Sequence, residues 1–182
     1  MSTATATQTA TWAIDNAHSE ISFKVKHLMI TNVTGYFREF GGHITPSEQG
    51  WEGASAEFVA MTASVDTNQK DRDAHLQSDD FFNAAQYPEL RFVSTSFEKA
   101  GGNQYKMTGN LTIRDITKTV TLNVESLGEV QDPYGNTKSG FEISGTINRQ
   151  DFGLRWSAVT EAGGIVVSDE VRLQLNVQVV RG

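Results

Sequence analysis

The stretch that decides the fold is Val171-Arg-Leu-Gln-Leu-Asn-Val-Gln-Val179, close to the carboxyl end of the chain. Apolar and polar side chains alternate through it without interruption. Successive side chains of a β-strand point to opposite faces, whereas a helix repeats about every 3.6 residues. The stretch therefore predicts a strand with one apolar face and one polar face.

Seven further segments are predicted to be strands, and three of them show the same alternation. The alternating segments are Ile21–Lys26, Val120–Leu127 and Phe141–Ile147, and the less regular ones are Thr34–Thr45, Ala54–Asp66, Leu90–Lys99 and Gln104–Arg114. Apolar side chains fall on both faces of Ala54–Asp66, which indicates cover on both sides or a bulge. Asp132–Asn136 carries the residues of a hairpin turn.

Two segments are expected to be helical. Lys70–Asn83 places a few apolar residues among charged ones, and His27–Asn32 has room for a single turn. The chain is therefore predicted to be all-β and mainly antiparallel, with about eight strands and one or two short helices. Eight strands must protect their edges, and both a closed barrel and a two-sheet sandwich do so. The barrel is favoured, but strand count alone leaves both open.

Composition excludes several classes of function. The chain has 182 residues, a net charge of −7 and no cysteine. The charge and the lack of a basic run argue against a nucleic-acid partner, and disulfides and thiolate sites are excluded. No apolar run approaches the roughly 20 residues of a membrane-spanning helix. Residues 1–11 are small and polar without the features of a secretory signal, so we expect a disordered tail and a cytoplasmic protein.

His27 shares the apolar parity of its strand with Phe23 and Val25. Such a histidine is more often hydrogen-bonded within a core than a polar anchor for a ligand, and a metal ligand is the least favoured interpretation. None of the four histidines has the spacing of a metal motif, so we expect no metal site.

The richest polar cluster lies between Asp66 and Asp80. An enzyme could use Asp66, Arg72, Asp73 and His75 for acid–base chemistry. The same residues can cap a helix and brace loops, which is the favoured interpretation. No nucleophile with a base and an orienting group is recognisable, so neither an enzyme nor a catalytic cofactor is expected.

Aromatic residues are plentiful, with 10 Phe, 4 Tyr and 3 Trp spread over most of the predicted strands. They could fill a solid core or line a cavity for an apolar ligand. Periodicity does not separate the two, and a solidly packed structural or interaction module stays an alternative.

A resemblance to a known family rests on short pieces in a fixed order from Trp12 to about Val180. The pieces are Trp12–His27, Gly35–Phe37, Ser64–Thr67, Arg72–Phe82, Tyr87–Pro88, Phe92, Gly109–Ile113, Thr117–Lys118 and Asn148–Gly153. In these the chain resembles the YceI-like proteins, a lipocalin-like family associated with polyisoprenoid binding. It departs from the family at Arg114-Asp115-Ile116, where a glycine turn is common, and we expect only the turn geometry to change.

The resemblance implies one extended eight-stranded lipocalin-like barrel over residues 12–182, holding an isoprenoid quinone or prenyl phosphate as carrier, store or sensor. It also implies a periplasmic location for many members and frequent homodimers. The residues expected to contact the lipid are Phe23, Val25, His27, Phe37, Phe40, Phe58, Met61, Phe92, Leu111, Phe141, Phe152 and Trp156.

Overall fold

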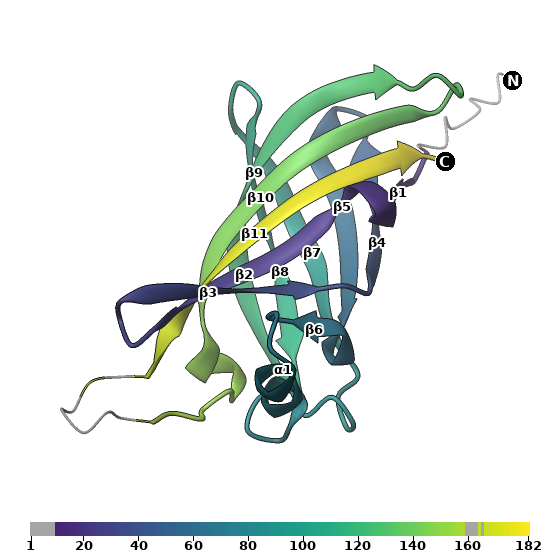
Figure 1. Cartoon of the computed structure of the whole chain (residues 1–182). Helices are drawn as coiled ribbons and strands as arrows, with labels where there is room; N and C mark the ends of the chain where they lie inside the picture. The colour runs from purple at the N-terminus through teal and green to yellow at the C-terminus, as the bar shows by residue number, and fades with distance from the viewer. Residues whose placement is uncertain (1–9, 159–163, 165) are drawn as a thin grey trace, which may run out of the picture.

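The computed structural model describes residues 10–158, 164 and 166–182, and most of these lie in antiparallel strands (Figure 1). The strands are β1 (Trp12–Ile14), β2 (Glu20–His27), β3 (Thr31–Phe37), β4 (Phe40–Ser47), β5 (Gly50–Met61), β6 (Val65–Asp66), β7 (Glu89–Gly101), β8 (Gln104–Ile113), β9 (Ile116–Gln131), β10 (Thr137–Asn148) and β11 (Val167–Arg181). One α-helix, α1, spans Lys70–Gln77, and 3₁₀ turns lie at Asn16–His18, Thr62–Ser64 and Arg149–Phe152.

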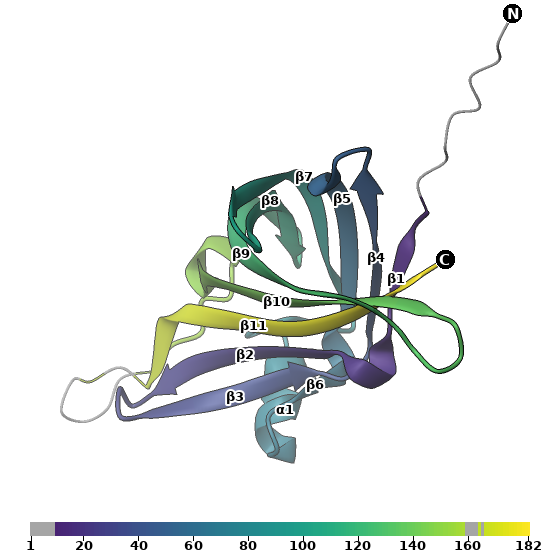
Figure 2. The ribbon, with the colours of Figure 1, turned by 90° about the horizontal axis from the view of Figure 1, so that it is seen from above.

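The strands close into a barrel because β11 pairs on both sides. One edge of β11 is hydrogen-bonded to β10. The other edge is hydrogen-bonded to β2 and, near the carboxyl end of β11, to β1. Three long extended segments are each interrupted by a short break. The first is divided into β1 and β2, the second into β3 and β4, and the third into β5 and β6. Counting each segment once gives eight strands around one interior (Figure 2). The barrel predicted from the sequence is confirmed, and the sandwich is excluded.

Two local predictions around β3 were wrong. The strand expected over Thr34–Thr45 is divided, because the backbone at Arg38 and Glu39 bonds to Ser64 and Met61 instead of continuing straight. The helical turn expected over His27–Asn32 is a tight turn between β2 and β3.

The helix is shorter than the predicted Lys70–Asn83. The side chain of Gln69 accepts a hydrogen bond from the Arg72 backbone at its start, and Ser78 bonds back to His75 at its end. The chain then turns, which buries Phe81 and Phe82 beneath the barrel end. No residue of the helix is fully buried, although Leu76 packs against the core, and the buried aromatic residues follow the helix.

Aromatic rings pack at the end of the barrel away from α1. The rings of Trp12 and Trp51 lie 5.3 Å apart, and those of Trp51 and Phe141 lie 5.0 Å apart. Both pairs meet edge to face, the arrangement that the ring quadrupoles favour. Beyond this end the β9–β10 hairpin turns at Asp132–Asn136 as predicted, with the Asp132 carboxylate accepting two backbone N–H groups.

The predicted disordered tail, residues 1–11, lies almost wholly outside the described residues. Thr11 is described, and its backbone carbonyl accepts a hydrogen bond from the amide of Gly182, which holds the two ends of the barrel domain together. No helix in the described part of the chain is long and apolar enough to cross a membrane.

Candidate functional site

The inner faces of the strands enclose an elongated cavity of about 380 Å³. Its wall is almost entirely apolar and draws on most of the strands of the barrel. Volumes of about 300–1,000 Å³ are typical of small-molecule sites. The barrel is therefore hollow, and the aromatic side chains line a cavity as well as filling a core.

Nine of the twelve residues predicted to contact a lipid lie on the cavity wall, and their role in binding stays a prediction. They are Phe23, Val25, His27, Phe37, Phe58, Phe92, Leu111, Phe141 and Trp156.

The structure places the other three away from the wall. Met61 has the opposite parity to Phe58 on β5, and the strand ends there, so its side chain is directed away from the cavity. Phe40 packs beside the ring of Phe58, with 6.3 Å between centroids. Phe152 is fully buried, but it lies in the 3₁₀ turn after β10 and packs outside the main cavity.

Several wall residues were not selected as site residues from the sequence, although their alternation was recognised. Leu122 and Val124 on β9, and Leu173 and Leu175 on β11, face the cavity. Because one face of each strand is apolar and turned inward, parity alone identifies them once the barrel is known.

Phe23 reaches the cavity because its cross-strand partner is a glycine. Phe23 pairs with Gly35, and its ring lies over the glycine where a Cβ would otherwise stand. The same ring contacts Phe37, with centroids 5.6 Å apart. Gly35 therefore sets the position of an aromatic side chain on the wall.

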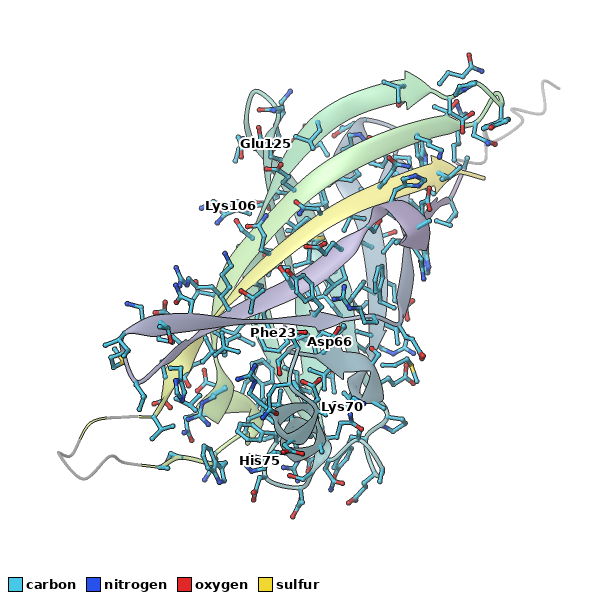
Figure 3. All side chains as sticks on the ribbon, in the orientation of Figure 1. Phe23, Asp66, Lys70, His75, Lys106 and Glu125 are labelled. Atoms are coloured by element: carbon cyan, nitrogen blue, oxygen red, sulfur yellow. The ribbon has the colours of Figure 1, made fainter. Side chains whose placement is uncertain are left out.

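The polar groups of the wall gather mostly at the α1 end of the cavity, where Figure 3 shows His75 on α1. At this end they are Lys26, His27, Thr67, Arg72, His75 and Arg149, while Ser22, His43 and Glu57 lie on β2, β4 and β5. We therefore take the α1 end as the polar mouth of an otherwise apolar cavity.

An aromatic cluster stands at this mouth. The imidazole of His75 packs edge-on against Trp156 at 4.9 Å and against Phe81 at 5.1 Å. Its Nε2 atom lies 2.8 Å from a carboxylate oxygen of Asp80. Helix α1 and the segment after η3 (Arg149–Phe152) are thus held together across the mouth.

Arg149 fixes the segment that carries Trp156. Its side chain is 3% exposed, and it donates hydrogen bonds to the carbonyls of Leu154, Trp156 and Ser168 and contacts the carboxylate of Asp169. Burial lowers the pKa of the Arg149 guanidinium, and the charge of Asp169 acts against that shift. The buried Arg149 guanidinium is hydrogen-bonded mainly to backbone carbonyls. These bonds hold the segment that carries Trp156 against the start of β11.

His27 lies at the mouth, half-buried, and its imidazole forms no hydrogen bond with any other described residue. The sequence predicted that the imidazole of His27 is hydrogen-bonded to other protein groups in the core. No such hydrogen bond is found among residues 10–158, 164 and 166–182. Within those residues no group of His, Cys, Asp or Glu is arranged to hold a metal ion.

The four residues of the enzyme alternative do not form one site. Asp66 bonds Arg38 and the backbone of Asn68, and Asp73 bonds both the backbone and the hydroxyl of Thr67. Arg72 donates to Thr67, and only Arg72 and His75 reach the cavity wall. The carboxylates act as braces, as the structural interpretation predicted.

Arg114 does more than change a turn. It adopts the left-handed conformation, with φ of 55°, in the turn between β8 and β9. Its guanidinium donates to the carbonyls of Asp79 and Phe81 and to the Asp79 carboxylate. The β8–β9 turn is thereby tied to the segment that holds Phe81 at the mouth.

A closed antiparallel barrel with a long apolar cavity and one polar mouth is a lipocalin-like barrel. Residues 12–179 match the YceI-like domain family, and the chain belongs to that family. Protein YceI of Escherichia coli O157:H7 is 36% identical over 167 residues, covering 92% of this chain and 84% of that protein.

Solved structures agree with this assignment. BcnA of Burkholderia cenocepacia is 27% identical and superposes with a TM-score of 0.79, covering 91% of this chain and 98% of BcnA. A polyisoprenoid binding domain from Saccharophagus degradans is 18% identical, with a TM-score of 0.67, over 94% of this chain and 98% of that domain. The second likeness shows the fold alone.

Proposed function

We propose that the protein binds one long isoprenoid lipid inside the barrel, with the chain along the apolar wall and the head group at the α1 end. The observation that carries the proposal is the cavity itself, apolar along the barrel and polar mainly at one end. The Saccharophagus degradans domain, whose fold the chain shares, is described as polyisoprenoid-binding. Holding such a chain out of water suits a carrier or store.

The wall chemistry favours a long chain over a short one. Burying one CH₂ group contributes about 0.8 kcal/mol, so ten carbons contribute about 8 kcal/mol in total. Association costs about 4–15 kcal/mol in lost freedom of motion. Without strong polar contacts, a ligand of only two isoprene units therefore binds weakly, and several units are needed for stable binding.

The mouth favours a head group that can accept hydrogen bonds. The imidazole of His27 forms no hydrogen bond with a described residue, and Arg72 is a cationic group of the same end. A quinone carbonyl or a phosphate oxygen can accept from such donors. Both head groups fit this chemistry, so the proposal names the class and not the compound.

A matched pair of variants tests the proposal. Val124 faces the cavity and is 1% exposed, whereas Val93 on β7 is 42% exposed and lies outside the cavity wall. Val124→Trp fills the cavity, and Val93→Trp makes the same change on the outer surface.

Uptake of a detergent-dispersed long-chain polyprenol is measured by native mass spectrometry. We expect the parent protein and Val93→Trp to take up one equivalent and Val124→Trp to take up much less. Circular dichroism checks that both variants are folded. Equal uptake by the two variants, or no uptake by the parent protein, would contradict the proposal.

A further inference from the structure

Three consecutive large apolar side chains stand in solvent at the turn between β2 and β3. Leu28, Met29 and Ile30 are 38%, 54% and 79% exposed. We call these three residues the apolar tip. In Figure 1 it projects from the barrel on the side opposite the β9–β10 hairpin, and Figure 2 agrees.

The turn does not explain these side chains. Ile30 donates its backbone N–H to His27, and the two central residues have positive φ, 53° for Leu28 and 59° for Met29. Two-residue turns of this kind favour Asn and Gly, because side chains of ordinary residues are strained at positive φ. Leu28 and Met29 are therefore strained in their backbone conformation. Because both side chains are exposed, packing within the described fold does not compensate for that strain.

The tip borders the cavity. The backbone N–H of Leu28 donates to the carbonyl of Val166, and His27 pairs with Val167. His27, Val166 and Val167 all lie on the cavity wall. A surface that covered the tip would therefore lie beside the end of the cavity that carries most of the polar wall groups.

The outer face next to the tip is basic, although the chain as a whole carries a net charge of −7. Lys24, Lys26 and Arg172 are exposed there, with Lys24 directly opposite Arg172 in the strand register. None of the three forms an ion pair with a described residue, and the nearby acid Asp169 is paired with Arg149. Within the described residues 166–172, Glu170 is the only other acid. Apolar side chains flanked by cations match an anionic lipid surface, where apolar groups insert and cations meet head groups.

We propose that the apolar tip docks the barrel onto an anionic lipid bilayer, with the cavity mouth at the surface, for exchange of the bound lipid with the membrane. This rests on the proposed function, because a bilayer is where a long isoprenoid resides. The contact is peripheral and reversible, since three side chains and a few cations fall far short of a spanning segment.

The test measures sedimentation with vesicles. One set contains phosphatidylcholine alone, and the other contains equal parts phosphatidylcholine and phosphatidylglycerol. Leu28→Asn/Met29→Gly removes two apolar side chains and supplies the residues that the turn favours, so the hairpin is retained. Leu127→Asn/Val130→Asn is the control, since Leu127 and Val130 are 58% and 67% exposed on the distant β9–β10 hairpin.

We expect the parent protein and the control to bind the anionic vesicles, more weakly at high salt, and the tip variant to bind them about tenfold less or worse. Transfer of a polyprenol from vesicles falls in parallel for the tip variant, while its uptake from detergent is unchanged. Equal binding of the tip variant and the parent protein to the anionic vesicles overturns the proposal. So does a parent protein that fails to bind the anionic vesicles.

A change in oligomeric state of the tip variant, seen by size-exclusion chromatography with light scattering, also overturns it, because the tip would then cover a second copy. Loss of detergent uptake in the parent protein contradicts the lipid-binding function itself. That outcome is separate from vesicle binding.

Discussion

Substituting Gly35 by alanine tests how the cavity wall is built. A Cβ at this position would lie 2.7 and 2.8 Å from the two ε carbons of the Phe23 ring, and closer still to its ζ carbon. Carbon atoms in favourable contact are about 3.5–4.0 Å apart. The ring must therefore retreat toward the cavity by close to 1 Å or more, and its contact with Phe37 changes.

The expected loss of stability follows from two opposing effects. Overpacking costs about 1–3 kcal/mol, while alanine in place of glycine stabilises by about 0.4–1 kcal/mol through the unfolded chain. Gly35→Ala should then lower the free energy of unfolding by up to about 2.6 kcal/mol. At about 2–4 °C per kcal/mol for a chain of this size, Tm falls by up to about 10 °C.

Gly41 on β4 provides the control, because a Cβ there meets no atom within 4 Å and its φ is not positive. Gly41→Ala should stabilise slightly, so urea denaturation should separate the two variants by about 1–3 kcal/mol. In a Phe23→Ala background the difference should vanish, because the ring is absent. A difference that persists in that background, or the absence of any difference in the parent protein, would refute this account of the wall.

Three further predictions concern the barrel and its mouth. Phe23→Asp places an unpaired carboxylate on the apolar wall, so we expect lower Tm and loss of bound lipid, and unchanged values of both would refute the inward placement of Phe23. Arg149→Met leaves the carbonyls of Leu154 and Trp156 without their donor, so we expect a loss of about 1–3 kcal/mol in urea denaturation and a changed Trp fluorescence spectrum; an unchanged spectrum contradicts the clamp. Hydrogen bonds from His18 and Lys138 lower the pKa of Asp15, so its contribution to stability is complete above the unfolded-state pKa near 4 and is lost as pH falls through the lower folded-state pKa. Asp15→Asn should therefore be less stable than the parent at pH 6 and approach it at pH 2, and a constant difference across this range would exclude that coupling.

The alternation of side chains predicted most of the fold. In Val171–Val179 the apolar residues were predicted to share one face of a strand. In the structure that face is turned inward and lines the cavity. The hairpin at Asp132–Asn136 was found because aspartate, proline and glycine act locally in turns. Such features depend on residues close together in the sequence, which is why they could be predicted.

Features that depend on distant partners could not be predicted. The break between β3 and β4 follows from backbone bonds to Met61 and Ser64. Met61 was assigned to the site because it is apolar, although parity with Phe58 turns it away. The use of Arg114 to hold the segment at Phe81 required knowing that the β8–β9 turn meets that segment in space. The sequence pattern predicts the two faces of a strand. It does not predict which distant segments contact the ends of the strands.

The same limit applies to the apolar tip between β2 and β3. The segment His27–Asn32 was expected to be a single helical turn. Leucine and methionine are uncommon at positive φ, so the sequence does not indicate the tight turn that the structure shows. Its exposure at the cavity mouth is visible only in the folded chain.

The central claim is that the cavity holds a long isoprenoid lipid. The most direct measurement is native mass spectrometry of the protein purified without added lipid, followed by organic extraction and identification of the released compound. The account predicts a mass excess of one lipid per chain and an extract containing an isoprenoid with several units. Protein that is reproducibly empty, or whose extract contains only a non-isoprenoid compound, would contradict it.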